Sequence, residues 1–166
     1  IAFISGTIQL EGLLNRSSGH KGAVILHPHP LYGGDMVNPV VETVADSYKK
    51  RGYTTLRFNF RGVGSSEGSF DSGNGEQEDV LAAVDYLTSQ GITSIHLAGY
   101  SFGAWVLVEI HGVSVSIIAL LYFIAATLGV VMRPLLGEVI DWLGERFVLA
   151  ASIDKDPAEL DRVQEN

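Results

Sequence analysis

The chain has 166 residues, of which 46% are hydrophobic and none is cysteine, and it carries a net charge of -8. This length accommodates one domain with a real core but not two full domains. The acidic balance argues against a nucleic-acid partner, because such proteins neutralise phosphates with basic side chains. The lack of cysteine excludes a disulfide framework, a thiol nucleophile and cysteine-based zinc sites, and it fits a reducing compartment.

The first fourteen residues are predicted to form a β-hairpin that turns at Ser5 and Gly6. From Gly22 to about Val108, buried strands and amphipathic helices alternate. The strands are expected at 23–26, 54–58 and 94–98, and the helices at 39–51 and 76–89. Strands separated by helices of this length imply right-handed crossovers and a mostly parallel sheet with both faces covered.

The most informative motif is Gly99-Tyr100-Ser101-Phe102-Gly103, which directly follows the predicted strand 94–98. Glycines at both ends permit a sharp strand-to-helix turn with Ser101 at its tip. We expect Gly99 to adopt a strained backbone conformation and Gly103 to let the following helix pack close. A serine so placed can attack a carbonyl, provided that a base takes its proton and backbone amides hold the oxyanion.

A second motif, His27-Pro28-His29-Pro30-Leu31-Tyr32-Gly33-Gly34, follows the strand 23–26. Pro28 and Pro30 have no N–H group, so the amide of His29 is a donor held between two fixed backbone angles. Together with the amide of Phe102, it is predicted to form an oxyanion hole. His27 and His29 could instead be a metal pair, but no carboxylate or third histidine falls at a supporting spacing. We therefore expect no metal, and imidazoles that pack or hydrogen-bond within the loop.

These motifs carry a family resemblance. Residues from about Phe3 to Val106 resemble the front half of bacterial α/β-hydrolases of the short, lidless type related to dienelactone hydrolases and small esterases. The matching stretches, in the family's order, are 27–34, 56–65 and 98–104. The resemblance implies an α/β fold, in which a β-hairpin precedes a parallel sheet with flanking helices. It also implies a cytoplasmic protein that needs no cofactor and acts on a small ester or acyl substrate.

The resemblance assigns roles to individual residues. Ser101 is the implied nucleophile, and the amides of His29 and Phe102 are the implied oxyanion hole. His27, Tyr32, Gly33 and Gly34 belong to the loop beside the pocket, and Arg61 lies in the loop that would shape the pocket wall. For Arg61, a solvated or structurally bridging arginine is an equally good interpretation.

The family orders its triad as serine, acid and histidine, and no histidine follows His111. Asp141, Asp154 and Asp156 are available acids, but none follows a recognisable strand. A helix rises about 1.5 Å per residue, so His111 is expected at the far end of the helix that begins at Ser101. His96 lies within a strand and is expected to pack. The triad is therefore not completed by the usual topology, and we expect weak turnover.

The segment from Val113 to Met132 contains no charged residue and has the length of a transmembrane helix. A core helix or a pair of buried strands is the alternative. We expect one long hydrophobic helix that ends at Arg133 and Pro134 and leaves the strand 94–98 at the sheet edge. If this helix spans a bilayer, the protein is membrane-associated.

Residues 117–150 resemble a cytoplasmic loop region of major facilitator transporters, with Gly137, Asp141, Gly144 and Arg146 at the matching spacing. Three parts are thus predicted: a partial hydrolase domain over 1–112, a hydrophobic segment over 113–150 and a polar tail over 151–166. Two functions compete, a serine hydrolase and a non-catalytic or chimeric chain that joins a hydrolase half to a transporter-like segment.

Overall fold

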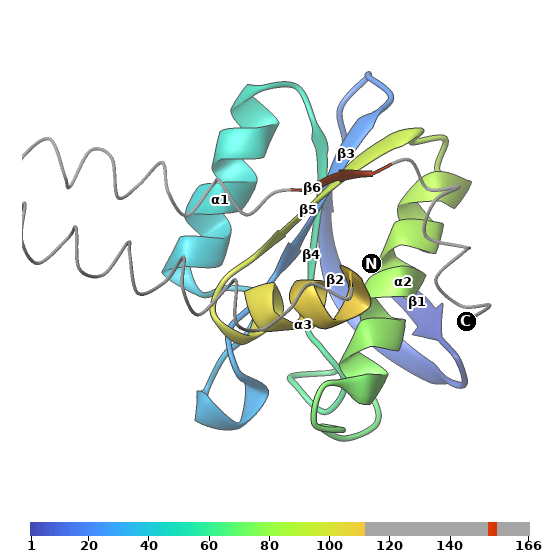
Figure 1. Cartoon of the computed structure of the whole chain (residues 1–166). Coiled ribbons are helices and arrows are strands. Elements are labelled where there is room, and N and C mark those ends of the chain that lie inside the picture. The colour runs from blue at the N-terminus through green and yellow to red at the C-terminus, as the bar shows by residue number, and fades with distance from the viewer. Residues whose placement is uncertain (112–152, 156–166) are drawn as a thin grey trace, which may run out of the picture.

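The computed structural model describes residues 1–111 and 153–155. Its centre is a six-stranded mixed sheet with the strand order β1-β2-β4-β3-β5-β6 (Figure 1). The strands are β1 Ala2–Ser5, β2 Ile8–Asn15, β3 Lys21–Leu26, β4 Thr54–Phe58, β5 Ser94–Gly99 and β6 Ile153–Lys155. The three strands β4, β3 and β5 are parallel, whereas the pairings β1·β2, β2·β4 and β5·β6 are antiparallel.

The prediction of a mostly parallel sheet is therefore correct only for its centre. The hairpin adds β2 antiparallel to β4, because the chain enters β3 from β2 without a crossover helix. The hairpin itself is confirmed, with Gly6 in the left-handed region at a φ of 58°.

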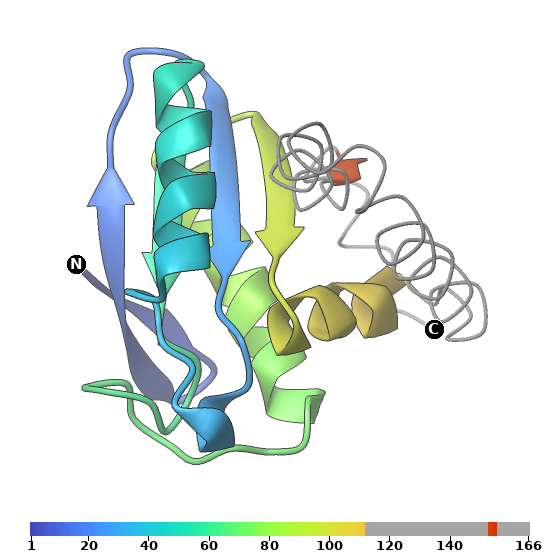
Figure 2. The same ribbon diagram turned by 90° about the vertical axis from the view of Figure 1, so that its left-hand side faces the viewer.

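Helices cover both faces of the sheet, as predicted. Helix α1, Pro39–Lys50, lies on one face, and α2, Asn74–Ser89, lies with α3, Phe102–His111, on the other (Figures 1 and 2). Strand β3 is buried on both faces: Ala23 and Ile25 pack with the residues of α1, whereas Val24 and Leu26 join the core on the opposite face. This double burial explains why its sequence is a continuous apolar run.

The predicted start and end of the first helix are confirmed. The side chain of Asn38 accepts a hydrogen bond of 3.0 Å from the amide of Val40, and Pro39 occupies the first helical position. Arg51 is the C-cap, and Gly52 follows in the left-handed region at a φ of 81°. This backbone conformation, which favours glycine, ends the helix.

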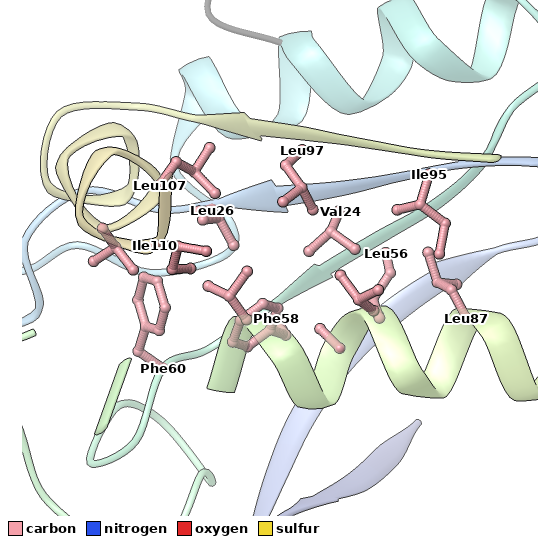
Figure 3. Packing of buried hydrophobic residues seen from close by; sticks show 14 of the residues in the cluster. Val24, Leu26, Leu56, Phe58, Phe60, Leu87, Ile95, Leu97, Leu107 and Ile110 are labelled. Carbon is pink, nitrogen blue, oxygen red and sulfur yellow. The ribbon is translucent and has the colours of Figure 1, made fainter. Parts of the chain in front are cut away.

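The larger core lies between the sheet and the helices α2 and α3. Leu56, Phe58 and Leu97 project from the strands toward Leu87 of α2 and Leu107 of α3 (Figure 3). Burial of an apolar side chain of this size contributes about 1.5–3 kcal/mol, so this layer holds the helices against the sheet.

Two expectations about the C-terminal region are revised. Strand β6 pairs antiparallel with Ile95–Leu97, so β5 is not the edge strand of the sheet. The predicted polar tail 151–166 therefore includes a strand at 153–155. The hydrophobic segment 113–132, with its predicted helix, lies outside the described residues. Within residues 1–111 and 153–155, none of the helices has the length and apolar content needed to cross a membrane.

Two leucine substitutions test this core. Leu56 is fully buried in β4, whereas Leu13 of the neighbouring strand β2 is 42% exposed. We expect Leu56→Ala to lower the free energy of unfolding by about 2–5 kcal/mol, because it leaves a cavity in the core. Leu13→Ala, the matched control, should change it by less than about 1 kcal/mol. Urea unfolding of the full chain measures both values, and equal losses would contradict the described packing.

Candidate active site

The two sequence motifs meet at one edge of the sheet. Strands β3 and β5 run in the same direction, and Leu26 at the end of β3 is paired with Gly99 at the end of β5 (Figure 2). The amide of Tyr100 also donates a hydrogen bond of 3.1 Å to the carbonyl of Leu26. The loops that follow the two strands are therefore neighbours at the carboxyl edge, where open α/β sheets bind their ligands.

Ser101 occupies the tip of the turn between β5 and α3. Its φ is 55°, a left-handed conformation that is uncommon for a residue other than glycine. The amide of Gly103 donates to the carbonyl of Tyr100 at 3.1 Å, and the amide of Trp105 donates to the carbonyl of Ser101 at 3.0 Å. These bonds start the helix immediately after the serine, whose side chain is exposed. Such strain at a single residue is a feature of functional sites.

Both glycines of the motif lie where a neighbouring segment of the chain leaves no room for a Cβ atom. A Cβ atom on Gly103 would lie 2.7 Å from Cβ of Leu26 and 2.8 Å from the carbonyl oxygen of His27. A Cβ atom on Gly99 would lie 2.5 Å from the backbone nitrogen of Ala104. The expectation that Gly99 itself is strained is wrong, because its φ is not positive and the strained residue is Ser101. Glycine is required at 99 because the first turn of α3 crosses directly over it.

The loop after β3 is compact. Pro30–Tyr32 form a short 3₁₀ turn, and Gly33 follows at a φ of 77°. The carbonyl of His29 accepts hydrogen bonds from the amides of Tyr32 and Gly34, both at 3.1 Å. Position 34 requires glycine, because a Cβ atom there would collide with the carbonyl of Pro28. The loop thus folds back on itself and fixes the backbone around His29.

The structure brings His29 and Phe102 together. Their ring centroids are 4.8 Å apart. Within residues 1–111 and 153–155, neither backbone amide donates a hydrogen bond, and the hydroxyl of Ser101 has no hydrogen-bond partner. Amide donors that are left unpaired in the two neighbouring loops are the kind of group that can bind the negative oxygen of a tetrahedral intermediate.

His27 supports the loop from the protein interior. Its side chain is fully buried, Nδ1 donates to the carbonyl of Pro28 at 2.6 Å, and Nε2 accepts from the amide of Phe60 at 3.1 Å. Burial lowers the pKa of His27 below its ordinary value, against the smaller raising effects of Pro28 and Asp35. A neutral imidazole with both nitrogens occupied cannot act as a base or a metal ligand.

Arg61 lies in a buried ion pair. Its Nη2 is 2.8 Å from Oδ1 of Asp79, a carboxylate whose side chain is fully buried, and 3.0 Å from Oε2 of the exposed Glu78. The hydroxyl of Ser5 donates to the same Oδ1 atom at 2.8 Å. Of the two interpretations left open by the sequence, this geometry favours structural bridging over substrate contact.

The sequence analysis did not predict Asp79 as the partner of Arg61. Asp79 falls between Glu76 and Ala83 on the buried face of α2, one helical turn from each. Two carboxylates, Glu76 and Asp79, on the same face as Val80, Ala83 and Leu87 are the signal that could have shown buried partners for polar groups nearby.

The described histidines do not supply an evident base. Nδ1 of His29 accepts a hydrogen bond of 3.2 Å from the amide of Leu31, so the neutral ring carries its proton on Nε2. The ring of His96 packs against Tyr48 and Tyr53. The candidate acid Asp154 lies within β6, opposite His96, and not after a parallel strand.

Asp141 and Asp156, the other two candidate acids, lie outside the described residues. Residues 1–111 and 153–155 also contain no group of three or more histidine or acidic side chains that could hold a metal ion.

This fold, with a serine at a strand–helix turn beside a compact loop, is that of an α/β hydrolase. The sequence profile of the Alpha/beta hydrolase family matches residues 23–163. The chain therefore belongs to this family. The matched range includes residues 117–150, for which the sequence predicted a resemblance to transporters, and the comparisons give that prediction no support.

Solved structures agree with this assignment. A serine hydrolase homologue from Coxiella burnetii is 40% identical with a TM-score of 0.63, over 66% of this chain and 55% of that chain. A lidless serine hydrolase from Xanthomonas campestris is 36% identical with a TM-score of 0.61, over 64% of this chain and 51% of that one. A protein of unknown function from Agrobacterium tumefaciens is 44% identical with a TM-score of 0.61, over 64% of this chain and 50% of that chain.

Among curated proteins, an uncharacterized protein of Rickettsia prowazekii is 48% identical over 90 residues, which are 53% of this chain and 38% of that protein. The chain thus spans between 38% and 55% of the length of these four relatives.

Two substitutions around one cation test the buried ion pair. Removal of the buried Asp79 carboxylate in Asp79→Ala leaves Arg61 without its main partner, and we expect the free energy of unfolding to fall by about 3–5 kcal/mol. Glu78→Ala removes an exposed partner of the same guanidinium and should cost at most about 1 kcal/mol. Denaturant unfolding of both variants checks this difference. A loss of unfolding free energy in Asp79→Ala as small as that in Glu78→Ala would contradict the buried ion pair between Arg61 and Asp79.

Proposed function

We propose that the chain is a serine hydrolase that attacks small ester or acyl substrates with the hydroxyl of Ser101. The observation that carries this proposal is the strained position of Ser101, at a φ of 55°, between the end of β5 and the start of α3. A backbone held in the left-handed region by two close glycine contacts presents the hydroxyl outward from the sheet edge.

The amides of His29 and Phe102 are the proposed oxyanion hole. In the attack, the hydroxyl oxygen of Ser101 bonds to the carbonyl carbon of the substrate, and the carbonyl oxygen becomes negative. Two unpaired N–H donors, one from each loop, then bind that oxygen. The helix α3 begins at Phe102, so the positive end of its dipole also faces the developing charge.

The acid and the base of the reaction are not assigned. His27 is neutral and fully hydrogen-bonded, and the usual order would require a histidine beyond His111, where the sequence has none. Without a base, serine remains a poor nucleophile, and removal of a triad member leaves about 10³–10⁴-fold catalysis over water. We therefore expect these 166 residues alone to hydrolyse esters slowly.

The alternative is a non-catalytic chain that joins a hydrolase half to a transporter-like segment in a membrane. The family match through residue 163 supports a hydrolase along most of the chain, and it favours the first proposal over this one. As part of the hydrolase proposal, we propose that the protein is cytoplasmic and needs no cofactor.

Ester hydrolysis tests the proposed nucleophile. With p-nitrophenyl acetate, we expect slow hydrolysis by the full chain that falls to the uncatalysed rate in Ser101→Ala. Ser18→Ala, an exposed serine in the β2–β3 loop, is the matched control and should keep the rate of the unmodified chain.

Equal rates for the unmodified chain and Ser101→Ala would reject Ser101 as the nucleophile. Turnover as fast as that of a complete triad would overturn the expected lack of a base, and His29, whose ring contacts Phe102, would be the first histidine to substitute.

A further inference from the structure

We propose that the substrate carries a flat aromatic ring, which binds against a row of aromatic side chains beside Ser101. This inference rests on the proposed function and names the class of substrate that the same site would take. The row, here called the aromatic row, consists of Tyr32, His29, Phe102, Trp105 and Phe70.

The aromatic row is continuous across three segments of the chain. The ring of His29 lies 4.7 Å from Tyr32 and 4.8 Å from Phe102, and the ring of Phe102 lies 5.5 Å from Trp105 in a stacked arrangement. Phe70 lies 5.0 Å from His29 and 5.7 Å from Phe102. The row thus links the loop after β3, the loop before α2 and the first turns of α3.

The position of the row ties it to the reacting atoms. His29 and Phe102 supply the two proposed oxyanion amides, and Ser101 directly precedes Phe102 in the chain. Phe102 is 8% exposed and belongs to the core, so it supports the row from below, and a substituent of the bound carbonyl would contact the more exposed rings around it. Aromatic rings prefer offset-stacked or edge-to-face contacts with centroids about 4.5–7 Å apart, so a planar substituent fits this surface.

Both ends of the row remain open to a ligand. Tyr32 is 87% exposed and Trp105 is 38% exposed, although large aromatic side chains are usually covered. The six-membered ring of Trp105 lies directly against Gly73, where a Cβ atom would collide with it. This contact and the stacking on Phe102 hold the indole in place, so the exposed part of Trp105 belongs to a fixed side chain and its binding costs little side-chain entropy.

Charge in this part of the protein points to a neutral ligand. The guanidinium of Arg61 is bound by Asp79 and Glu78, so its charge is already neutralised by two carboxylates. An aromatic ester needs no cation to bind the row, whereas a substrate with a free carboxylate would find Arg61 already paired.

Binding of two matched esters tests the proposal separately from catalysis. Methyl benzoate and methyl cyclohexanecarboxylate have the same ester group and ring size, but only the first has a planar aromatic ring. We expect Ser101→Ala, in which hydrolysis is blocked, to bind methyl benzoate about two- to tenfold more tightly, as judged from the energy of one aromatic pair. Chemical-shift titration of the full chain measures both dissociation constants.

Variants of the row identify the contact. Because methyl benzoate has one ring and Tyr32 and Trp105 lie at opposite ends of the row, Tyr32→Ala or Trp105→Leu should reduce the preference for the planar ester toward one. Tyr32→Phe should keep the preference because the ring remains. Ile4→Ala on β1, which removes an apolar side chain that is 60% exposed on a different strand, is the control that should keep it. Equal binding of the two esters, or a preference that Tyr32→Ala and Trp105→Leu leave intact, would overturn the proposal.

The two proposals fail differently. A preference for the planar ester together with hydrolysis that does not depend on Ser101 would support the aromatic site and reject the nucleophile. Hydrolysis that depends on Ser101 without any preference in binding would do the reverse.

Discussion

The site depends on one close contact, the approach of the first turn of α3 to the ends of β3 and β5. Gly103 lies against Leu26 and His27, and Gly99 lies under the turn, so neither position has room for a Cβ atom. Because the helix begins so close to the sheet, the chain must reverse within two residues, and Ser101 takes the strained conformation. The exposure of the hydroxyl is thus a consequence of packing between backbone segments.

The loop after β3 is held by polar contacts with its neighbours. His27 binds the amide of Phe60, and the buried Asn59 accepts a hydrogen bond of 2.8 Å from the amide of Met36. The amide group of Asn59 in turn donates to Glu11 at 2.7 Å, which connects the loops after β3 and β4 with the hairpin. Buried polar groups of this kind are costly when unpaired, so each contact helps to specify a single loop conformation.

Local sequence patterns were sufficient for most of the fold. The hairpin that turns at Ser5 and Gly6, the helix 39–51 and the central strands were predicted from short stretches of sequence, because such signals act within a few residues. The partners of Arg61 and the reason for glycine at 99 were not predictable in this way. Asp79 meets Arg61 across 18 residues, and Gly99 is restricted by the turn that crosses it, so both depend on tertiary contacts.

The C-terminal region also contains a contact that local sequence patterns could not predict. The pairing of Ile153–Lys155 with β5 joins residues more than fifty positions apart, and no local pattern in those three residues selects that partner. The family match extends to residue 163, whereas the hydrolase motifs in the sequence end at Ala104, so the motifs did not predict it.

The most direct measurement of the central claim is the site of covalent modification by an excess of a fluorophosphonate, located by mass spectrometry of the digested full chain. Ser72 is an internal control, because it has the same φ of 55° as Ser101 but lies in the loop before α2. We expect a phosphonyl adduct on Ser101 and none on Ser72, since a strained backbone alone does not place two amides beside a hydroxyl. An adduct on Ser72, or no adduct on Ser101 after prolonged exposure, would contradict the proposed nucleophile.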